Sequence, residues 1–420
     1  MLIRKIKSLR DHFALSNVPF KSRQSYYYEM ISGIFEAVYV AIVFNLLIFI
    51  ANKTIHVSET QLSIIMVGLF TGSLVGTIAP MMLRFSKKKH YVVLSGILTK
   101  GFLIVCGFVD SPSLFTWVSF IVFITGGLGV SAYAGIVGTN YPNSVRNSIL
   151  GKIRTLHTFV VIIVAYIMGK VLEADENYYK ILFPISGVCG LISTYFFSKV
   201  IVRDERRKNY DFQKPLFAFK DLYRVIREDK RFRRYENYYS LGGVAIIMLG
   251  RVFVPYITDE LHADYDQIAK VAAVFKNIAI VLTLALWGKF MDKNDNPIYD
   301  RIILIFIFMC EPIIYFISHN IYLVYIGSII AAVAHSGGML NWLLSPLYFC
   351  KPKDNSLYSA VHTLYNGFRG LIAPFLAQYL CSFVGIRNSF FVLALLMLLS
   401  GLLFIRFYQE EKAALMYQRA

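Results

Sequence analysis

The sequence has little charge and little cysteine. Of its 420 residues, 16% are charged and 56% are hydrophobic, and 26 acidic residues stand against 43 Lys and Arg, for a net charge of +17. The cysteines are scattered, and no two have the spacing of a metal site or a redox motif. We expect all five, Cys106, Cys189, Cys310, Cys350 and Cys381, to be small apolar core residues. The scarcity of charge excludes an ordinary soluble protein.

Signatures of catalysis and nucleotide binding are also missing. The sequence contains no GxxxxGK followed by Ser or Thr, so nothing supports ATP-driven transport by this chain alone. It contains no HExxH, no GxSxG and no cluster of carboxylates. The glycine-rich stretch 126–135 lies inside an apolar run, where glycine favours close helix packing. We therefore expect neither an enzyme nor a bound cofactor or metal ion.

Long apolar runs dominate the sequence. A helix needs about 20 mostly apolar residues to cross a hydrocarbon core of about 30 Å. Runs such as FLIVCGFV and VLALLMLLSGLLF lack the alternation of a β-barrel strand, so an all-α membrane protein is predicted. Twelve candidate transmembrane helices lie near residues 28–50, 60–83, 91–109, 114–138, 150–172, 179–200, 237–257, 265–288, 298–317, 321–348, 356–383 and 389–408.

Basic residues lie in alternate connectors between these spans. The connector after the second span carries Arg84, Lys87, Lys88 and Lys89, whereas the connectors VDSPS and SHN carry no Lys or Arg. Connectors rich in Lys and Arg face the cytoplasm. The alternation predicts a multi-pass protein of the lipid bilayer with both termini in the cytoplasm. It also explains the basic excess without nucleic-acid binding.

The most basic stretch, residues 199–235, holds thirteen of the 43 Lys and Arg residues. A central Arg or Lys costs roughly 2.5–3.5 kcal/mol in a membrane span, so this stretch is predicted to be a cytoplasmic connector exposed to water. Apolar residues recur within it at helical spacing, which favours a short amphipathic helix at the membrane surface over a disordered linker. These residues are Leu216, Phe219, Leu222, Val225 and Ile226, after Pro215.

Six spans lie on either side of this connector, which suggests an internal duplication. When the sequence is shifted by 208 residues, RNSILGKIRTL (146–156) falls on DNSLYSAVHTL (354–364) with four identities, at the start of the fifth span of each half. The predicted organisation is an N-terminal tail (1–27), a six-helix bundle (28–200), the basic linker (201–236), a second six-helix bundle (237–408) and a C-terminal tail (409–420).

The connector between the eighth and ninth spans, WGKFMDKNDNPIYDR, places Gly288, Asp292 and Lys293 in the pattern Gly-x-x-x-Asp followed by basic residues. With this signature and two six-span halves, the chain resembles the major facilitator superfamily of membrane transporters over its whole length. The eleventh span is similar to those of poorly characterised bacterial members. The counterpart of the signature in the first half departs from it, because Pro80 replaces the Gly and Arg84 replaces the Asp.

The resemblance implies two six-helix bundles that rock about a solute site at their interface, near the middle of the bilayer. It implies a secondary transporter, probably monomeric in the sense of one chain forming the whole pathway, in the bacterial inner (plasma) membrane. A small-molecule solute is the expected partner, and coupling to protons stays open. Gating falls to Arg84, Arg154, Gly288, Asp292 and Lys293. The alternative is a non-transporting membrane receptor, scaffold or lipid-modifying protein on the same fold, which the replacement by Arg84 favours.

The eleventh span carries the best polar constellation. His362, Tyr365, Asn366 and Arg369 follow helical spacing and share one face, which should meet the cavity or the other bundle. Arg369 could hold a carboxylate or phosphate through two hydrogen bonds, or it could be a gating contact. The small neighbours of Arg369 allow another helix to approach closely.

Other ionisable or polar groups inside the spans are further candidates. Glu36 could exchange a proton, or it could form an ion pair with a basic residue of a neighbouring helix. The deeper charges, with Lys100 and Glu311 given less weight, have a positive excess, which predicts an anionic or zwitterionic solute. The additional candidates for the cavity are Arg251, Lys276, His335 and Asn341.

Overall fold

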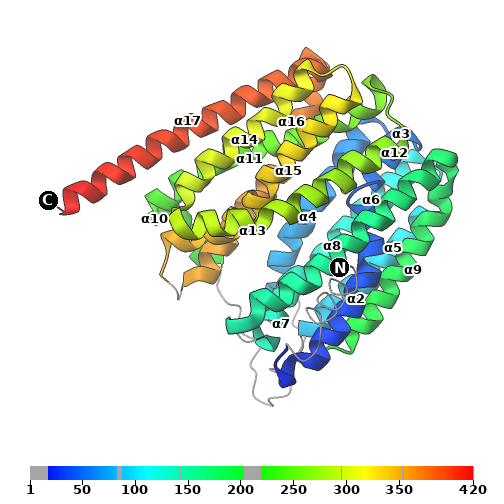
Figure 1. The fold of residues 1–420 in the computed structure, drawn as a ribbon, viewed down its shortest axis with the longest axis horizontal. Helices are drawn as coiled ribbons and strands as arrows, with labels where there is room; N and C mark the ends of the chain where they lie inside the picture. Colours follow the sequence, from blue (N-terminus) through cyan, green and yellow to red (C-terminus); the bar gives the residue numbers. More distant parts are fainter. Residues whose placement is uncertain are drawn as a thin grey trace, which may run out of the picture.

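The computed structural model describes residues 18–82, 88–141, 143–202, 219–294, 296–351 and 354–419. These residues form helices and no strand (Figure 1). The first half contains η2 (Phe20–Ser22), α2 (Arg23–Val43), α3 (Leu47–Lys53), α4 (Glu59–Met82), α5 (Lys88–Cys106), α6 (Pro112–Gly127), α7 (Val130–Asn140), α8 (Asn143–Ala174), η3 (Glu176–Tyr178) and α9 (Tyr179–Ser198).

The second half is likewise helical. It contains α10 (Phe219–Glu228), α11 (Lys230–Pro255), η5 (Tyr256–Glu260), α12 (Tyr265–Ala269), η6 (Lys270–Phe275), α13 (Lys276–Asn294), α14 (Pro297–Ile317), α15 (Ile321–Leu344), η7 (Ser345–Phe349), α16 (Asn355–Val384) and α17 (Ile386–Arg419). The segments η5 and η6 are π-helical turns that continue α11 and join α12 to α13.

Each predicted span falls on helix, and ten helices of the described chain are long and apolar enough to cross a membrane. The predicted span 114–138 is divided between the short helices α6 and α7. The predicted span 298–317 coincides with α14, which carries the charged residues Asp300, Arg301 and Glu311. Both helices have few charges elsewhere, because apolar side chains that face lipid or neighbouring helices leave little room for them.

The helices form two bundles, α2–α9 and α11–α17, which lie side by side (Figure 1). The largest cluster of buried apolar residues joins both bundles, and it includes residues of α3 and α12. Four smaller apolar clusters each contain residues of one bundle only. We call the end that carries α3 and α12 the α3 end, and the opposite end, where α10 lies, the α10 end.

The turn after α3 and the turn after η5 have the same backbone path. Val57 N–H donates to the Ala51 carbonyl at 3.0 Å, and 206 residues later Ala263 N–H donates to the Ile257 carbonyl at 3.0 Å. In both turns a histidine adopts the left-handed conformation, which is uncommon outside glycine. These residues are His56, with φ 53°, and His262, with φ 49°.

The helix that follows each turn also begins in the same way. Ser58 and Gln61 exchange backbone and side-chain hydrogen bonds at the start of α4. Asp264 and Gln267 do the same at the start of α12. This reciprocal pair, a capping box, satisfies N–H groups that have no partner within the helix. The shared turn and cap support the internal duplication.

The amphipathic segment of the central connector forms α10. Its apolar residues Leu222 and Val225 are buried in a cluster with Phe232 of α11, Val361 of α16 and Phe404 of α17. The expectation that this apolar face lies on the membrane is therefore wrong, because the C-terminal bundle covers it. The predicted residues Pro215 and Leu216 lie outside the described part of the chain.

Candidate functional site

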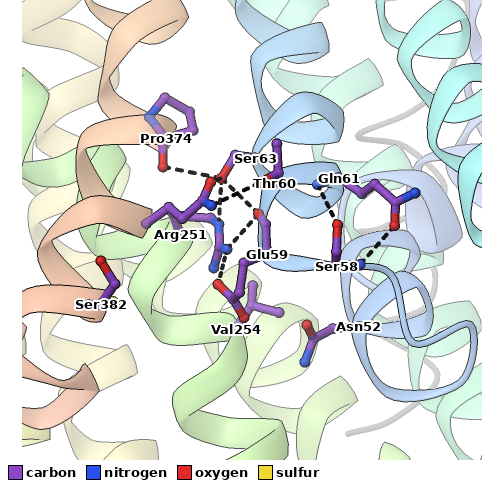
Figure 2. A network of polar contacts seen from close by, with 12 residues as sticks. Asn52, Ser58, Glu59, Thr60, Gln61, Ser63, Arg251, Val254, Pro374 and Ser382 are labelled. Atoms are coloured by element: carbon purple, nitrogen blue, oxygen red, sulfur yellow. Dashed lines mark hydrogen bonds and ion pairs between the residues drawn. The ribbon is translucent and has the colours of Figure 1, made fainter.

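At the α3 end, Arg251 of α11 connects the two bundles (Figure 2). Its side chain is fully buried and forms an ion pair with the Glu59 carboxylate of α4. Arg251 Nη2 also donates to the Glu59 carbonyl at 3.0 Å, and Nε donates to Ser63 Oγ at 3.1 Å. The predicted cavity residue Arg251 is thus part of a contact between α4 and α11.

The eleventh-span helix α16 extends this contact. Ser63 Oγ lies 3.3 Å from the Pro374 carbonyl and 3.1 Å from Gln378 Oε1. Gln378 Nε2 in turn donates to Thr60 Oγ1 at 2.9 Å. One hydroxyl, Ser63, therefore links α4 of the first bundle to both α11 and α16 of the second.

A second polar contact joins α8 to α12 at the same end. Lys170 Nζ lies 3.2 Å from Asp266 Oδ2, and the Tyr265 N–H donates to Glu173 Oε2 at 2.9 Å. Here too a small residue permits close packing, since a Cβ at Gly169 would lie 2.5 Å from the Cβ of the α12 helix at position 269.

The end of α3 provides a third contact. Asn52 Nδ2 donates to Thr258 Oγ1 at 2.8 Å and to Asp259 Oδ1 at 3.0 Å, and Lys53 Nζ donates to the Ala263 carbonyl at 3.1 Å. Together these three contacts hold the bundles together at the α3 end. No comparable inter-bundle hydrogen bond or ion pair is present at the α10 end among the described residues.

Glu36 forms an ion pair inside the first bundle. Its Oε1 accepts a hydrogen bond from Lys100 Nζ of α5 at 2.8 Å, and the same ammonium lies 4.4 Å from the centre of the Tyr39 ring. Of the two expectations for Glu36, the ion pair is therefore present in this structure. Lys100, given less weight from the sequence, is the partner.

The polar face of α16 meets its own bundle. His362 Nδ1 lies 2.7 Å from Glu236 Oε1 of α11, with side chains 1% and 0% exposed. Arg369 Nε and Nη2 donate to Asn366 Oδ1, and the guanidinium lies 5.1 Å from the centre of the Tyr239 ring. The expectation that this face meets the cavity or the other bundle is wrong for these residues, because they pack on α11.

The two glycines beside Arg369 do meet the other bundle, as their size suggested. A Cβ at Gly367 would lie 2.1 Å from Leu74 Cδ2, and a Cβ at Gly370 would lie 2.0 Å from Phe70 Cγ, both on α4. Real Cβ atoms cannot approach so closely, so these positions require glycine for α4 and α16 to touch. Arg369 is therefore placed at the edge of the interface between the bundles.

The other candidates of the second bundle are not gathered at one site. Lys276 of α13 and Glu311 of α14 interact electrostatically. The His335 ring lies 6.4 Å from the Phe308 ring. Asn341 Nδ2 donates to the Pro297 carbonyl at 3.0 Å, which fixes the start of α14.

Tyr365 is half-buried beside the apolar cluster under α10. It completes the stripe predicted on α16, but it forms no hydrogen bond within the described residues.

The predicted gating residues make few contacts. Asp292 and Lys293 are exposed and form no ion pair within the described residues, and Gly288 is half-buried near Leu340. Arg154 is exposed on α8 and likewise has no carboxylate partner in the part of the chain described. Arg84 lies outside that part.

Sequence reasoning missed Glu59, Glu236 and Arg301. Glu59 lies at the border of a predicted span, and Glu236 falls in the predicted linker. A signal for Glu236 exists in the repeat, because a shift of 207 residues places Tyr28-Glu29 on Tyr235-Glu236. Both glutamates are buried, which marks the position as unusual in each half.

Comparison with known proteins was made for both sequence and structure. No curated protein matches the sequence. A mutant of the nucleoside transporter NupG superposes with a TM-score of 0.72 at 11% identity, covering 92% of this chain and all of the other. A POT family transporter in complex with 5-aminolevulinic acid gives 0.71 at 13% identity, covering 94% and 99%. A D-xylose-proton symporter gives 0.65 at 12% identity, covering 91% and 97%.

At these identities the structural likeness shows the fold alone. The sequence itself matches the Major Facilitator Superfamily twice, over residues 30–253 and 239–419, one match for each half. These two ranges cover nearly the whole chain and agree with the two bundles of the structure. The resemblance inferred from the sequence is thereby confirmed, and the chain belongs to the Major Facilitator Superfamily.

Proposed function

We propose that the protein is a secondary transporter that moves a small anionic or zwitterionic solute by alternating access. The observation that carries this proposal is the asymmetry between the two ends of the molecule. Three polar contacts close the bundles against each other at the α3 end, and the apolar clusters toward the α10 end each belong to one bundle. Such a state has the solute pathway closed on one side only.

The membrane arrangement that goes with this function has twelve spans and cytoplasmic termini, in the inner membrane of a bacterium. The α3 end then faces outward, and the structure represents the inward-facing state. One chain supplies both bundles, so a monomer suffices for transport. The basic connectors support this orientation.

The charge of the solute is argued from the ion pairs. Glu36 neutralises Lys100, and Glu59 neutralises Arg251. Arg369, at the edge of the inter-bundle interface, has an amide partner and no carboxylate within hydrogen-bond distance among the described residues. A guanidinium in that position favours a carboxylate or phosphate, which it can bind through two parallel hydrogen bonds.

The fold does not select the solute. The titles of similar structures name nucleosides, D-xylose and 5-aminolevulinic acid, which differ in charge and size. The second candidate function, a non-transporting receptor, scaffold or lipid-modifying protein, is favoured by Pro80 and Arg84 in the degenerate signature of the first half. Solute movement separates the two candidates directly.

The test is counterflow into liposomes that contain the purified protein. L-Lactate, L-glutamate, succinate and inorganic phosphate serve as anionic or zwitterionic probes, with D-xylose and uridine as neutral probes. We expect counterflow of at least one anionic or zwitterionic probe, slowed about tenfold or more by Arg369→Gln, since charged hydrogen bonds contribute about 1.5–3 kcal/mol. Arg406→Gln, at an exposed position of α17, is the matched control. Counterflow of neutral probes alone would overturn the assignment of charge.

A further inference from the structure

A buried charged cluster lies around Tyr239 inside the second bundle. The centre of its ring lies 4.1 Å from Arg301 Cζ, 5.1 Å from Arg369 Cζ and 5.0 Å from the centre of the His362 ring. Glu236 is bonded to His362. We call these five residues the Tyr239 cluster. They come from α11, α14 and α16, so the cluster joins three helices of one bundle.

Several polar atoms of the Tyr239 cluster are buried without a hydrogen-bond partner. They are Nε and Nη2 of Arg301, Nη1 of Arg369, Nε2 of His362 and Oε2 of Glu236. Leaving such an atom unpaired costs about 1–3 kcal/mol, and native structures contain few of them. So many in one place indicate that the cluster binds something during its working cycle.

The Tyr239 cluster is positively charged in either protonation state of its histidine. Arg301 and Arg369 contribute two positive charges and Glu236 one negative charge. Asp300 lies beside Arg301 in the chain, but it forms no ion pair within the described residues, and Asn294 is the polar group that interacts with its carboxylate. The charges therefore do not cancel.

Other groups around His362 are neutral under ordinary conditions. Helix α11 contributes the phenols of Tyr235 and Tyr239, and α16 contributes that of Tyr365. Helix α15 contributes Trp342, whose ring lies 5.5 Å from that of His362. Glu236 is thus the negative charge that faces the imidazole, and the two arginines are the positive ones.

The hydrogen bond between Glu236 and His362 fixes where a proton can bind. A carboxylate only accepts hydrogen bonds, so Nδ1 of the neutral imidazole carries the hydrogen and donates it to Oε1. The lone pair is then on Nε2, which has no partner in this structure. A proton that binds at Nε2 makes an imidazolium that is held against a carboxylate.

We propose that the Glu236–His362 pair is the site of the transported proton, and that its occupancy is coupled to that of an anion bound at Arg369. This inference rests on the proposed transport function and names its coupling residues. The proton enters from water on one side of the membrane, binds His362 Nε2 and leaves to water on the other side. No bond other than this N–H bond forms or breaks.

Electrostatics gives the coupling its sign. An anion at Arg369 cancels one positive charge near His362, so the imidazole binds a proton more readily. By reciprocity, a protonated His362 favours the anion by the same factor. For unit charges about 10 Å apart at an effective dielectric constant of about 20, the factor is on the order of tenfold. The two therefore move together, as in a proton–anion symporter.

Trp342 provides a reporter for the proton, because an imidazolium quenches indole fluorescence at short range. The experiment measures the pH dependence of the part of the fluorescence that Trp342→Phe removes, in full-length protein in detergent. We expect this signal to fall as the pH falls, and we expect His362→Gln to abolish the dependence. His319→Gln, which changes an exposed histidine at the other end, is the matched control and should preserve it.

Glu236→Gln is the second variant, and it keeps a hydrogen-bonding group beside His362. We expect it to move the midpoint of the titration to lower pH, because the imidazolium loses its counter-charge. L-Lactate, L-glutamate or phosphate should move the wild-type midpoint to higher pH. A titration that persists in His362→Gln would refute the proton site. A midpoint that none of the anions moves would refute the coupling.

Transport measurements separate this inference from the function on which it rests. Liposomes loaded with the pH dye pyranine receive L-lactate, L-glutamate or phosphate outside, and internal acidification is recorded together with counterflow. We expect both in the wild type, and counterflow without acidification in His362→Gln. Acidification that survives in that variant would overturn the coupling role. Absence of counterflow for every probe in the wild type would overturn transport, while the fluorescence titration still decides whether the pair binds a proton.

Discussion

The contact between Glu59 and Arg251 makes a quantitative prediction about which state the protein occupies. Glu59→Gln removes the charge of the carboxylate and leaves Arg251, which is 0% exposed, without a counter-ion between the bundles. Breaking a fully buried pair costs about 3–5 kcal/mol. An exposed pair contributes about 0.2–1 kcal/mol. The Glu59 side chain is 52% exposed, so we take a value between these limits, about 1.5 kcal/mol.

This cost applies only while the α3 end is closed. When the bundles separate there, water reaches Arg251 and the penalty disappears, so the substitution shifts the equilibrium toward the state that is open at the α3 end. A change of about 1.5 kcal/mol corresponds to about tenfold in the ratio of the two states.

Distances between spin labels measure that ratio. Labels at Ala174, the last residue of α8, and Tyr322, near the start of α15, lie at exposed positions of the two bundles on the α3 end. We expect Glu59→Gln to increase the longer-distance population about tenfold relative to the shorter one. Asp110→Asn is the matched control, since it breaks an ion pair with Lys180 at the same end but within one bundle. An unchanged distribution in Glu59→Gln, or an equal change in the control, would refute the role of the contact.

Three further predictions test packing, pairing and pH. Gly370→Ala places a Cβ 2.0 Å from a ring carbon of α4, so we expect a loss of about 1–3 kcal/mol in thermal unfolding, whereas Gly101→Ala, with nothing within 4 Å, should not destabilise. Glu36→Gln and Lys100→Gln should each lower Tm, and the double variant by less than the sum; additive effects would contradict the ion pair. Hydrogen bonds from Lys180 and Tyr179 lower the pKa of Asp110, so its contribution to stability is present near neutral pH and lost as the pH falls through that lowered pKa; Asp110→Asn should flatten the acid side of a Tm–pH profile, and an unchanged profile would contradict this.

The arrangement along the chain was predictable because the membrane imposes it locally. Apolar length gave the spans, and helical spacing placed His362, Asn366 and Arg369 on one face of α16, where the structure has them. What that face meets was not predictable from spacing. Gly242 and Gly243 make room for the side chains on α11, and a Cβ at Gly243 would lie 2.6 Å from Arg369 Nη1.

Pairs between distant helices were out of reach for the same reason. Arg251 and Glu59 are separated by 192 residues, and no local pattern connects them. Intramembrane charge told only that each needs a partner. A sequence that contains several acids and several bases allows many pairings, and the fold selects among them by bringing particular helix faces together.

The duplication shows which features a repeat preserves and which it allows to diverge. The turns after α3 and η5 share a left-handed histidine and a capping box, because turn geometry restricts the residues that fit. The side chains of the inter-bundle contacts are not restricted in this way.

The polar contacts of the two halves illustrate the divergence. Thr60 and Gln378 form a neutral hydrogen bond, whereas the residues about 206 to 208 positions away, Asp266 and Lys170, form an ion pair. The same contrast holds at the Tyr239 cluster. The buried Glu236 has its equivalent in Glu29, but the position of His362 is taken in the first half by an arginine that is exposed. If the second bundle alone binds the proton, while both bundles enclose the solute, then a proton bound in one bundle can change the affinity of a site that the two bundles share, and this is what coupling requires.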